Sequence, residues 1–223
     1  MTLQTLTCVG YIQTVLSAVV AFLALIRFKS REIYVKLIGL IFLLSFMANV
    51  AAYILYYLGL KFYTNIPQSI YEPIMIGVVS ILYYQALNKR YSRFFLIVTV
   101  CSIAFAVFNL FFLQKQSISS YPKFVNSFII IGYCIFYFYR LMVELPSTNL
   151  QRLPMFWFNS AFLIYFAGAL ILFIFTSYIV NILKDNLITY WVFHNTLSIC
   201  EHLIVLTGLY FNLKYRGLQE ITL

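Results

Sequence analysis

A long apolar segment, YWVFHNTLSICEHLIVLTGLYF (residues 190–211), carries three ionisable side chains, including both histidines of the chain. On an α-helix, with about 100° between successive residues, five of its polar side chains fall within one arc of about 120°. These side chains are His194, Asn195, Ser198, Glu201 and His202. An ionisable group inside a membrane is costly and normally faces the bundle interior or a wet cavity. The spacing therefore predicts a polar stripe that faces inward.

A second carboxyl group, Glu72, lies in the apolar segment IPQSIYEPIMIGV. Glu72 and His194 each lie about six or seven residues inside a predicted helix, so both are roughly 9–10 Å below the same end of the bundle. Pro73 has no N–H group, which favours a kink next to Glu72. An imidazole and a carboxylate at equal depth can pair if their helices touch. We therefore predict a pair between His194 and Glu72, with Glu201 at the deeper end of the stripe.

Amide side chains from other apolar segments fall at the same level, namely Gln13, Asn49, Asn109 and Asn126. Such convergence predicts a polar pocket reached from outside, as in small-ligand sites between helices. The candidate ligand-binding residues are Asn49, Glu72, Asn126, His194, Asn195, Glu201 and His202. Asn159, toward the other end, is placed to cap the deep end of the stripe. The alternative is a set of separate interhelical hydrogen bonds that only hold the helices together.

The composition points to a lipid environment for the elements that carry these residues. Of 223 residues, 63% are hydrophobic and 9% are charged, whereas soluble proteins carry roughly 25% charged residues. A bilayer core of about 30 Å needs roughly 20 apolar residues of helix. The chain has seven such segments: 8–27, 35–59, 66–87, 94–113, 122–143, 155–180 and 187–212. With short connections between them, they predict an all-α integral membrane protein, a seven-transmembrane-helix bundle that forms a single domain over residues 1–223.

The basic residues are divided unevenly between the two ends of the predicted bundle. Eleven of the 15 fall at the end of the C-terminus: Arg27, Lys29, Arg31, Lys36, Lys89, Arg90, Arg93, Arg140, Arg152, Lys214 and Arg216. The other four are Lys61, Lys115, Lys123 and Lys184. Because cytoplasmic loops carry the excess of Lys and Arg, the N-terminus is predicted outside and the C-terminus in the cytoplasm, in a bacterial inner membrane. The lipid bilayer accounts for the net charge of +9, and no nucleic-acid partner is expected.

Motifs of enzymes and cofactor proteins are missing from the sequence. It contains no HExxH, GxSxG or P-loop, and no lysine in the middle of the last helix that could bind retinal. The cysteines, Cys8, Cys101, Cys134 and Cys200, show no zinc-site spacing. We therefore expect no catalytic residues, metal or cofactor, and a lipid-modifying enzyme is only a third alternative.

The last two apolar segments resemble those of a group of small membrane proteins. The pattern consists of aromatic, amide and histidine residues: Phe156, Trp157, Asn159, Tyr165, Trp191 and His194. It resembles the end of uncharacterised small seven-helix membrane proteins of Bacteroidetes, some of which are associated with sensor histidine kinases. The resemblance implies a membrane sensor or signal-coupling module with a cytoplasmic signalling partner such as a histidine kinase.

Two functions are therefore compared. One is a receptor-like sensory or signal-coupling module whose outer pocket binds a small molecule or lipid. The other is a small transporter or proton-coupled permease, in which Glu72, His194 and Glu201 form the ion path. The chain has no internal repeat and no pair of broken helices, which counts against transport.

Overall fold

The computed structural model describes residues 3–26, 31–60, 63–109, 112, 120–144, 150–178 and 187–221. In these ranges all regular structure is helical, which confirms the all-α class. The seven α-helices are α1 (Leu3–Leu25), α2 (Ile33–Tyr57), α3 (Ile66–Ala86), α4 (Ser92–Phe108), α5 (Ser120–Glu144), α6 (Pro154–Tyr178) and α7 (Leu187–Ile221), and a short 3-10 helix, η4 (Leu150–Arg152), precedes α6. The predicted ends at 27, 113 and 180 lie outside the described residues. The helix predicted to end at 212 continues to Ile221.

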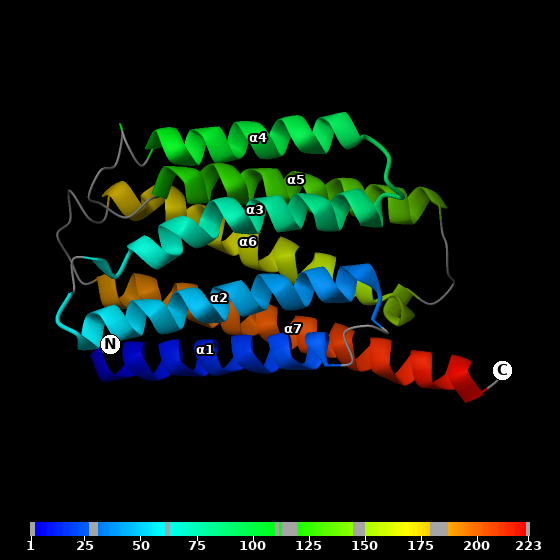
Figure 1. The fold of residues 1–223 in the computed structure, drawn as a ribbon, viewed down its shortest axis with the longest axis horizontal. Coiled ribbons are helices and arrows are strands. Elements are labelled where there is room, and N and C mark those ends of the chain that lie inside the picture. The colour runs from blue at the N-terminus through cyan, green and yellow to red at the C-terminus, as the bar shows by residue number, and fades with distance from the viewer. Residues whose placement is uncertain are drawn as a thin grey trace.

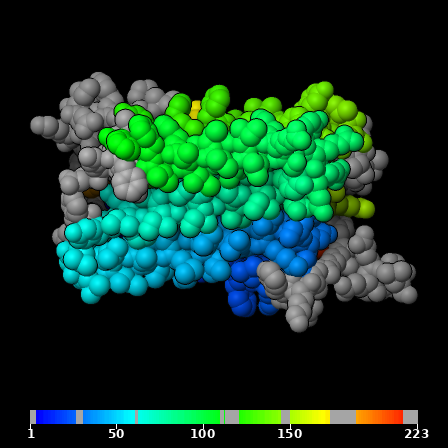
Figure 2. Space-filling view, turned by 45° about the horizontal axis from the view of Figure 1, so that its top comes forward, coloured from blue at the N-terminus to red at the C-terminus, as the bar shows by residue number. Residues whose placement is uncertain are grey.

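The helices lie side by side along the long axis of the molecule (Figure 1). Six of them close a ring in which α1 packs on α2, α2 on α3, α3 on α5, α5 on α6, α6 on α7, and α7 on α1. The remaining helix, α4, lies outside this ring against α3 and α5. Figure 2 shows α2, α3 and α4 side by side on one face.

The six ring helices are also the six described helices that are long and apolar enough to cross a membrane. The peripheral helix α4 is apolar but has only 17 described residues. Its buried residues are Phe95 and Ser102, whereas Leu96, Ile97 and Val100 are exposed. An apolar surface of this extent is unusual for a soluble monomer.

The connection between α2 and α3 is built from residues suited to ending and starting helices. Gly59, just after the end of α2, has φ +80°, a conformation that glycine adopts without steric cost. Asn65 precedes α3, and Pro67 lies in its first turn, where a missing N–H group costs nothing. The helix then continues through Pro73. This connection places the first two turns of α3 at the end of the bundle that carries the N-terminus (Figure 1).

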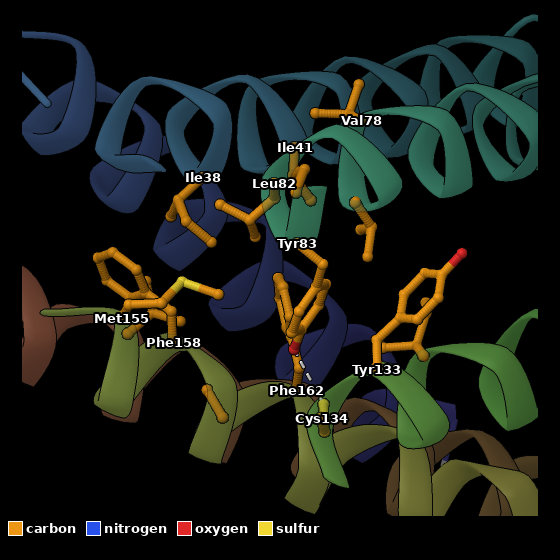
Figure 3. Packing of buried hydrophobic residues seen from close by; sticks show 14 of the residues in the cluster. Ile38, Ile41, Val78, Leu82, Tyr83, Tyr133, Cys134, Met155, Phe158 and Phe162 are labelled. Carbon is orange, nitrogen blue, oxygen red and sulfur yellow. Dashed lines mark hydrogen bonds between the residues drawn. The ribbon is translucent and has the colours of Figure 1, made fainter. Parts of the chain in front are cut away.

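The half of the bundle toward the start of α6 is closely packed. In Figure 3, the Tyr83 ring lies among Leu82, Phe158 and Phe162, with its hydroxyl group beside Cys134. The Tyr83 hydroxyl donates a hydrogen bond of 2.6 Å to Asn159 Oδ1 and lies 3.0 Å from Cys134 Sγ. Asn159 Nδ2 in turn donates to the Cys134 carbonyl oxygen at 3.2 Å.

This network corrects the prediction for Asn159. Its side chain does not cap the polar stripe of α7, because both of its polar atoms are engaged by α3 and α5. The same half brings α6 and α7 very close together at Gly208. A Cβ atom there would lie 2.7 Å from the Cβ atom of Trp157. This half is therefore a satisfied, tightly packed core.

Candidate functional site

A cavity of about 170 Å³ lies in the other half of the bundle, between the six helices of the ring. Each ring helix contributes to its lining, whereas α4 does not. Asn65, which is exposed, and Gln68 line it where α3 begins, so the cavity reaches the end of the bundle. Glu201 and His202 line its deep part, and Phe162 separates it from the packed core.

The cavity brings together most of the side chains selected from the sequence. Its lining includes the predicted residues Asn49, Glu72, His194, Asn195, Glu201 and His202, together with Gln13. The polar stripe of α7 therefore faces the bundle interior, as its helical spacing predicts. Binding of a ligand by these residues stays a prediction.

Two amides differ from the prediction. Asn126 is 2% exposed and does not line the cavity, whereas the next residue, Ser127, does. It lies behind the lining, beside the Glu72 carboxyl group, although its Nδ2 atom makes no hydrogen bond of normal geometry with the described residues. Asn109, which follows the end of α4, is buried but is not among the lining residues, because α4 is outside the ring.

His194 and Glu72 face the same cavity but do not form the predicted pair. In the described part of the chain, no ion pair joins them. The reason is the packing order, since α7 packs on α1 and α6 whereas α3 packs on α2, α4 and α5. His194 lies between the rings of Tyr165 and Trp191, at centroid distances of 5.8 and 5.7 Å.

The charge near Glu72 and His194 comes from a residue that the sequence reasoning did not select. Lys123, in the first turn of α5, lines the cavity and acts electrostatically on both Glu72 and His194. The positive side chain therefore stands near the outer level of the cavity. Lys123 lies at the very start of a predicted span and was counted there only as a loop charge. Its position in the cavity was therefore not predicted.

His202 is fixed by hydrogen bonds to two helices. Its Nδ1 atom donates to the Ser198 carbonyl oxygen of the preceding turn. Its Nε2 atom lies 2.7 Å from the Ser17 hydroxyl of α1, which is itself 3.1 Å from the Gln13 carbonyl oxygen. The Phe42 ring packs against the imidazole edge-on at 4.7 Å. His202 thus ties α7 to α1, and both of its ring nitrogens are already engaged.

Glu201 differs from its neighbour in sequence. It is 7% exposed and lines the deep part of the cavity, but no hydrogen bond or ion pair of its carboxyl group is found among the described residues. Lys123, which acts on Glu72, is not among the groups that act on Glu201. Glu201 is therefore a buried acid with a face open to the cavity and no partner in the described protein.

Aromatic rings form much of the remaining wall and were not selected from the sequence. They are Phe42, Tyr71, Phe162, Tyr165, Phe166 and Trp191. Aromatic residues make up 20% of the chain, so their number alone could not single out these six. Tyr165 and Trp191 belong to the pattern of the last two helices, which was the one available signal.

No protein-family model, curated protein or solved structure matches this chain. The resemblance of its last two helices to small membrane proteins of Bacteroidetes therefore stays a prediction. Among the described residues, no group of three or more His, Cys, Asp or Glu side chains is placed to hold a metal ion. The site is thus characterised by its own geometry: a small cavity with acids, amides, one lysine and aromatic walls.

Proposed function

We propose that this chain is a receptor-like membrane module that binds a small polar molecule in the cavity and passes the signal to a cytoplasmic partner. Six apolar helices and the apolar outer surface support membrane insertion. Basic residues flank the helix ends that meet at the packed end: Arg31 precedes α2, Lys89 and Arg90 follow α3, Arg140 lies near the end of α5, and Arg152 precedes α6. The positive-inside rule then orients the packed end to the cytoplasm and the cavity to the outside.

The observation that carries the proposal is that the cavity occupies one half of the bundle, while buried side chains of the described residues fill the space below it. Access from outside with a packed floor suits a receptor that binds and holds its ligand. Transporters have their substrate site near the midplane and alternate its access between the two sides. Here Phe162, Phe158 and Tyr83 fill the space below the cavity. This favours binding over the alternative of a permease.

Helix α7 offers a route from the cavity to the cytoplasmic end. It is 35 residues long, or about 52 Å at 1.5 Å per residue, and it carries both His194 and Asn212. Asn212 Oδ1 accepts a hydrogen bond of 3.2 Å from Arg31, whose guanidinium group also donates to carbonyl oxygens at the end of α1. A ligand that shifts α7 would therefore also change its contacts at the basic end. Small shifts of packed helices are a common element of switching.

The partner expected at that end is a cytoplasmic signalling protein. The resemblance of the last two helices suggests a histidine kinase, and the basic residues of the packed end provide a charged surface for such contact. This assignment depends on the proposed orientation. It fails if the basic end is found outside.

Binding is tested with purified protein in detergent and in nanodiscs, by thermal unfolding against a library of small polar metabolites. A ligand at about 100 times its Kd adds about 2.7 kcal/mol, which raises the unfolding midpoint by about 5–10 °C for a chain of this size. Asn195→Leu, which fills part of the cavity, should abolish the shift, whereas the exposed Glu32→Gln should retain it.

Transport is tested with the same ligand in proteoliposomes. The proposal predicts no uptake above that of empty liposomes, with or without a proton gradient. Uptake that is lost in Glu72→Gln would contradict it and support the permease.

A further inference from the structure

We propose that the ligand of this cavity is a small organic cation, whose ammonium group is held by Glu201 and enclosed by aromatic rings. The inference rests on the proposed function, because it names the chemical class of the molecule that the cavity binds. It follows from three features: the state of Glu201, the charges around it, and the walls and size of the cavity.

Glu201 lacks a partner of its own. A buried charge is costly unless it is paired and hydrogen-bonded, and proteins normally supply such partners. Glu201 has none among the described residues although it is more than nine-tenths buried, and its carboxyl group lines the cavity. A cationic group in the cavity would supply the missing counter-charge and hydrogen bonds.

The charges of the cavity are balanced at its outer level but not at its deep end. The outer acid, Glu72, has Lys123 and the Asn126 amide beside it. The deep acid, Glu201, has no lysine or arginine acting on it. His202 is held by Ser17 and Ser198 instead. The deep part of the cavity therefore disfavours an anion. A neutral ligand would leave the charge of Glu201 without a counter-charge.

The walls suit a cation as well. A cation within about 6 Å of an aromatic ring centre is attracted by the face of the ring, and such contacts recognise ammonium groups. Six aromatic side chains line the cavity. Tyr165 and Tyr71 lie within electrostatic range of Glu201. The same small space thus combines a carboxylate with aromatic rings.

The size of the cavity limits the ligand. Its volume of about 170 Å³ is below the roughly 300–1,000 Å³ of pockets for drug-sized molecules. It is similar to an engineered cavity of about 150 Å³ that binds benzene, so an amine with a few carbon atoms fits. A divalent metal ion fits the donors less well, because Ca²⁺ takes about six to eight oxygen ligands and the described acids and histidines form no cluster of three.

The test compares probes of similar size and different charge on the full-length protein in nanodiscs. The probes are propylammonium chloride, tetramethylammonium chloride, 1-propanol and sodium propionate, at equal ionic strength. We expect the two ammonium salts to raise the unfolding midpoint and the alcohol and carboxylate not to do so. Isothermal titration should show at least a tenfold weaker affinity for both cations in Glu201→Gln. The control Glu32→Gln, which changes an exposed acid away from the cavity, should bind like the wild type.

A second variant covers the case in which Glu201→Gln does not fold. Tyr165→Leu keeps the carboxylate and removes an aromatic ring that lies within electrostatic range of Glu201, so it should weaken tetramethylammonium binding by at least threefold. Equal affinity of wild type and Tyr165→Leu for the cation contradicts the aromatic part of the proposal.

The remaining outcomes separate this inference from the proposed function. If 1-propanol, propionate or a metabolite of the library binds in the cavity and the ammonium salts do not, the inference is wrong and the proposed function stands. If no compound of any class binds, both are wrong.

Discussion

The two halves of the bundle treat their buried polar groups differently. In the packed half, Asn159 uses both its oxygen and its nitrogen, on Tyr83 and on Cys134. In the cavity half, the Nδ2 atom of the lining residue Asn49 makes no hydrogen bond with the described residues, and Glu201 has no partner there either. Buried polar groups of a stable core are normally satisfied. The contrast suggests that one half uses its polar groups for folding and the other keeps them for a ligand.

Surface labelling tests the largest expected difference between the halves, which is the side of the membrane that each faces. In a background without native cysteines, a cysteine at Tyr63, next to the cavity end, should react fully with an impermeant maleimide added to intact cells. A cysteine at Arg90, at the packed end, should react only after lysis. The reverse pattern would overturn the orientation, and with it the cytoplasmic partner.

Asn159→Leu should have the largest effect on stability. It removes both hydrogen bonds of the Asn159 side chain and leaves the buried Tyr83 hydroxyl and the Cys134 carbonyl with fewer partners. Each unsatisfied buried group costs about 1–3 kcal/mol, so we expect a loss of about 2–4 kcal/mol in unfolding free energy. The measurement is denaturant unfolding in detergent micelles, with Thr99→Val on the peripheral α4 as the control. An effect below that of the control would show that the network is not needed for the packed half.

Gly208→Ala tests how closely the packed half is filled. The added Cβ atom would lie 2.7 Å from the Cβ atom of Trp157 and 3.0 Å from Phe158 Cε1. Overpacking of this kind costs about 1–3 kcal/mol. Gly77→Ala is the matched control, because no atom lies within 4 Å of a Cβ atom there. Equal unfolding free energies of the two variants would contradict the close approach of α6 and α7.

The smallest effect is expected for the coupling between Glu72 and His194 across the cavity. A direct buried pair loses about 3–5 kcal/mol when one partner is removed, and the double mutant then loses much less than the sum. Since no ion pair joins these side chains but both share the cavity and Lys123, the effects of Glu72→Gln and His194→Ala should add to within about 1 kcal/mol. A double-mutant cycle of unfolding free energies measures this. A coupling energy above about 1 kcal/mol would show that Glu72 and His194 form a direct pair after all.

The fold was predictable from the sequence where length and polarity decide it. Apolar segments of bilayer length gave the helices, and the 100° spacing along α7 placed its polar stripe toward the interior. The order of the helices around the ring could not be predicted from the sequence. The prediction for Asn109 is wrong for this reason, because depth along the axis does not show that α4 lies outside.

The same limit explains the outcome at the site. Equal depth placed Glu72 and His194 at one level, and both face the cavity, but the depth of a residue carries no information about its direction around the bundle. The partners of Glu72, Lys123 and Asn126, come from α5, whose contact with α3 depends on packing alone. The lack of a partner at Glu201 is likewise a property of the assembled bundle. It has no signature in the sequence.

The central claim is that the acid in the cavity is not part of what holds the fold together. It is tested most directly by comparing Glu201→Met and Asn159→Leu in unliganded protein, by denaturant unfolding in the same detergent. Replacing an unpartnered buried acid by an apolar side chain of similar size is expected to be neutral or stabilising. The account predicts that Glu201→Met unfolds at the wild-type midpoint or above it, while Asn159→Leu loses about 2–4 kcal/mol. A loss of stability in Glu201→Met as large as that in Asn159→Leu would contradict it.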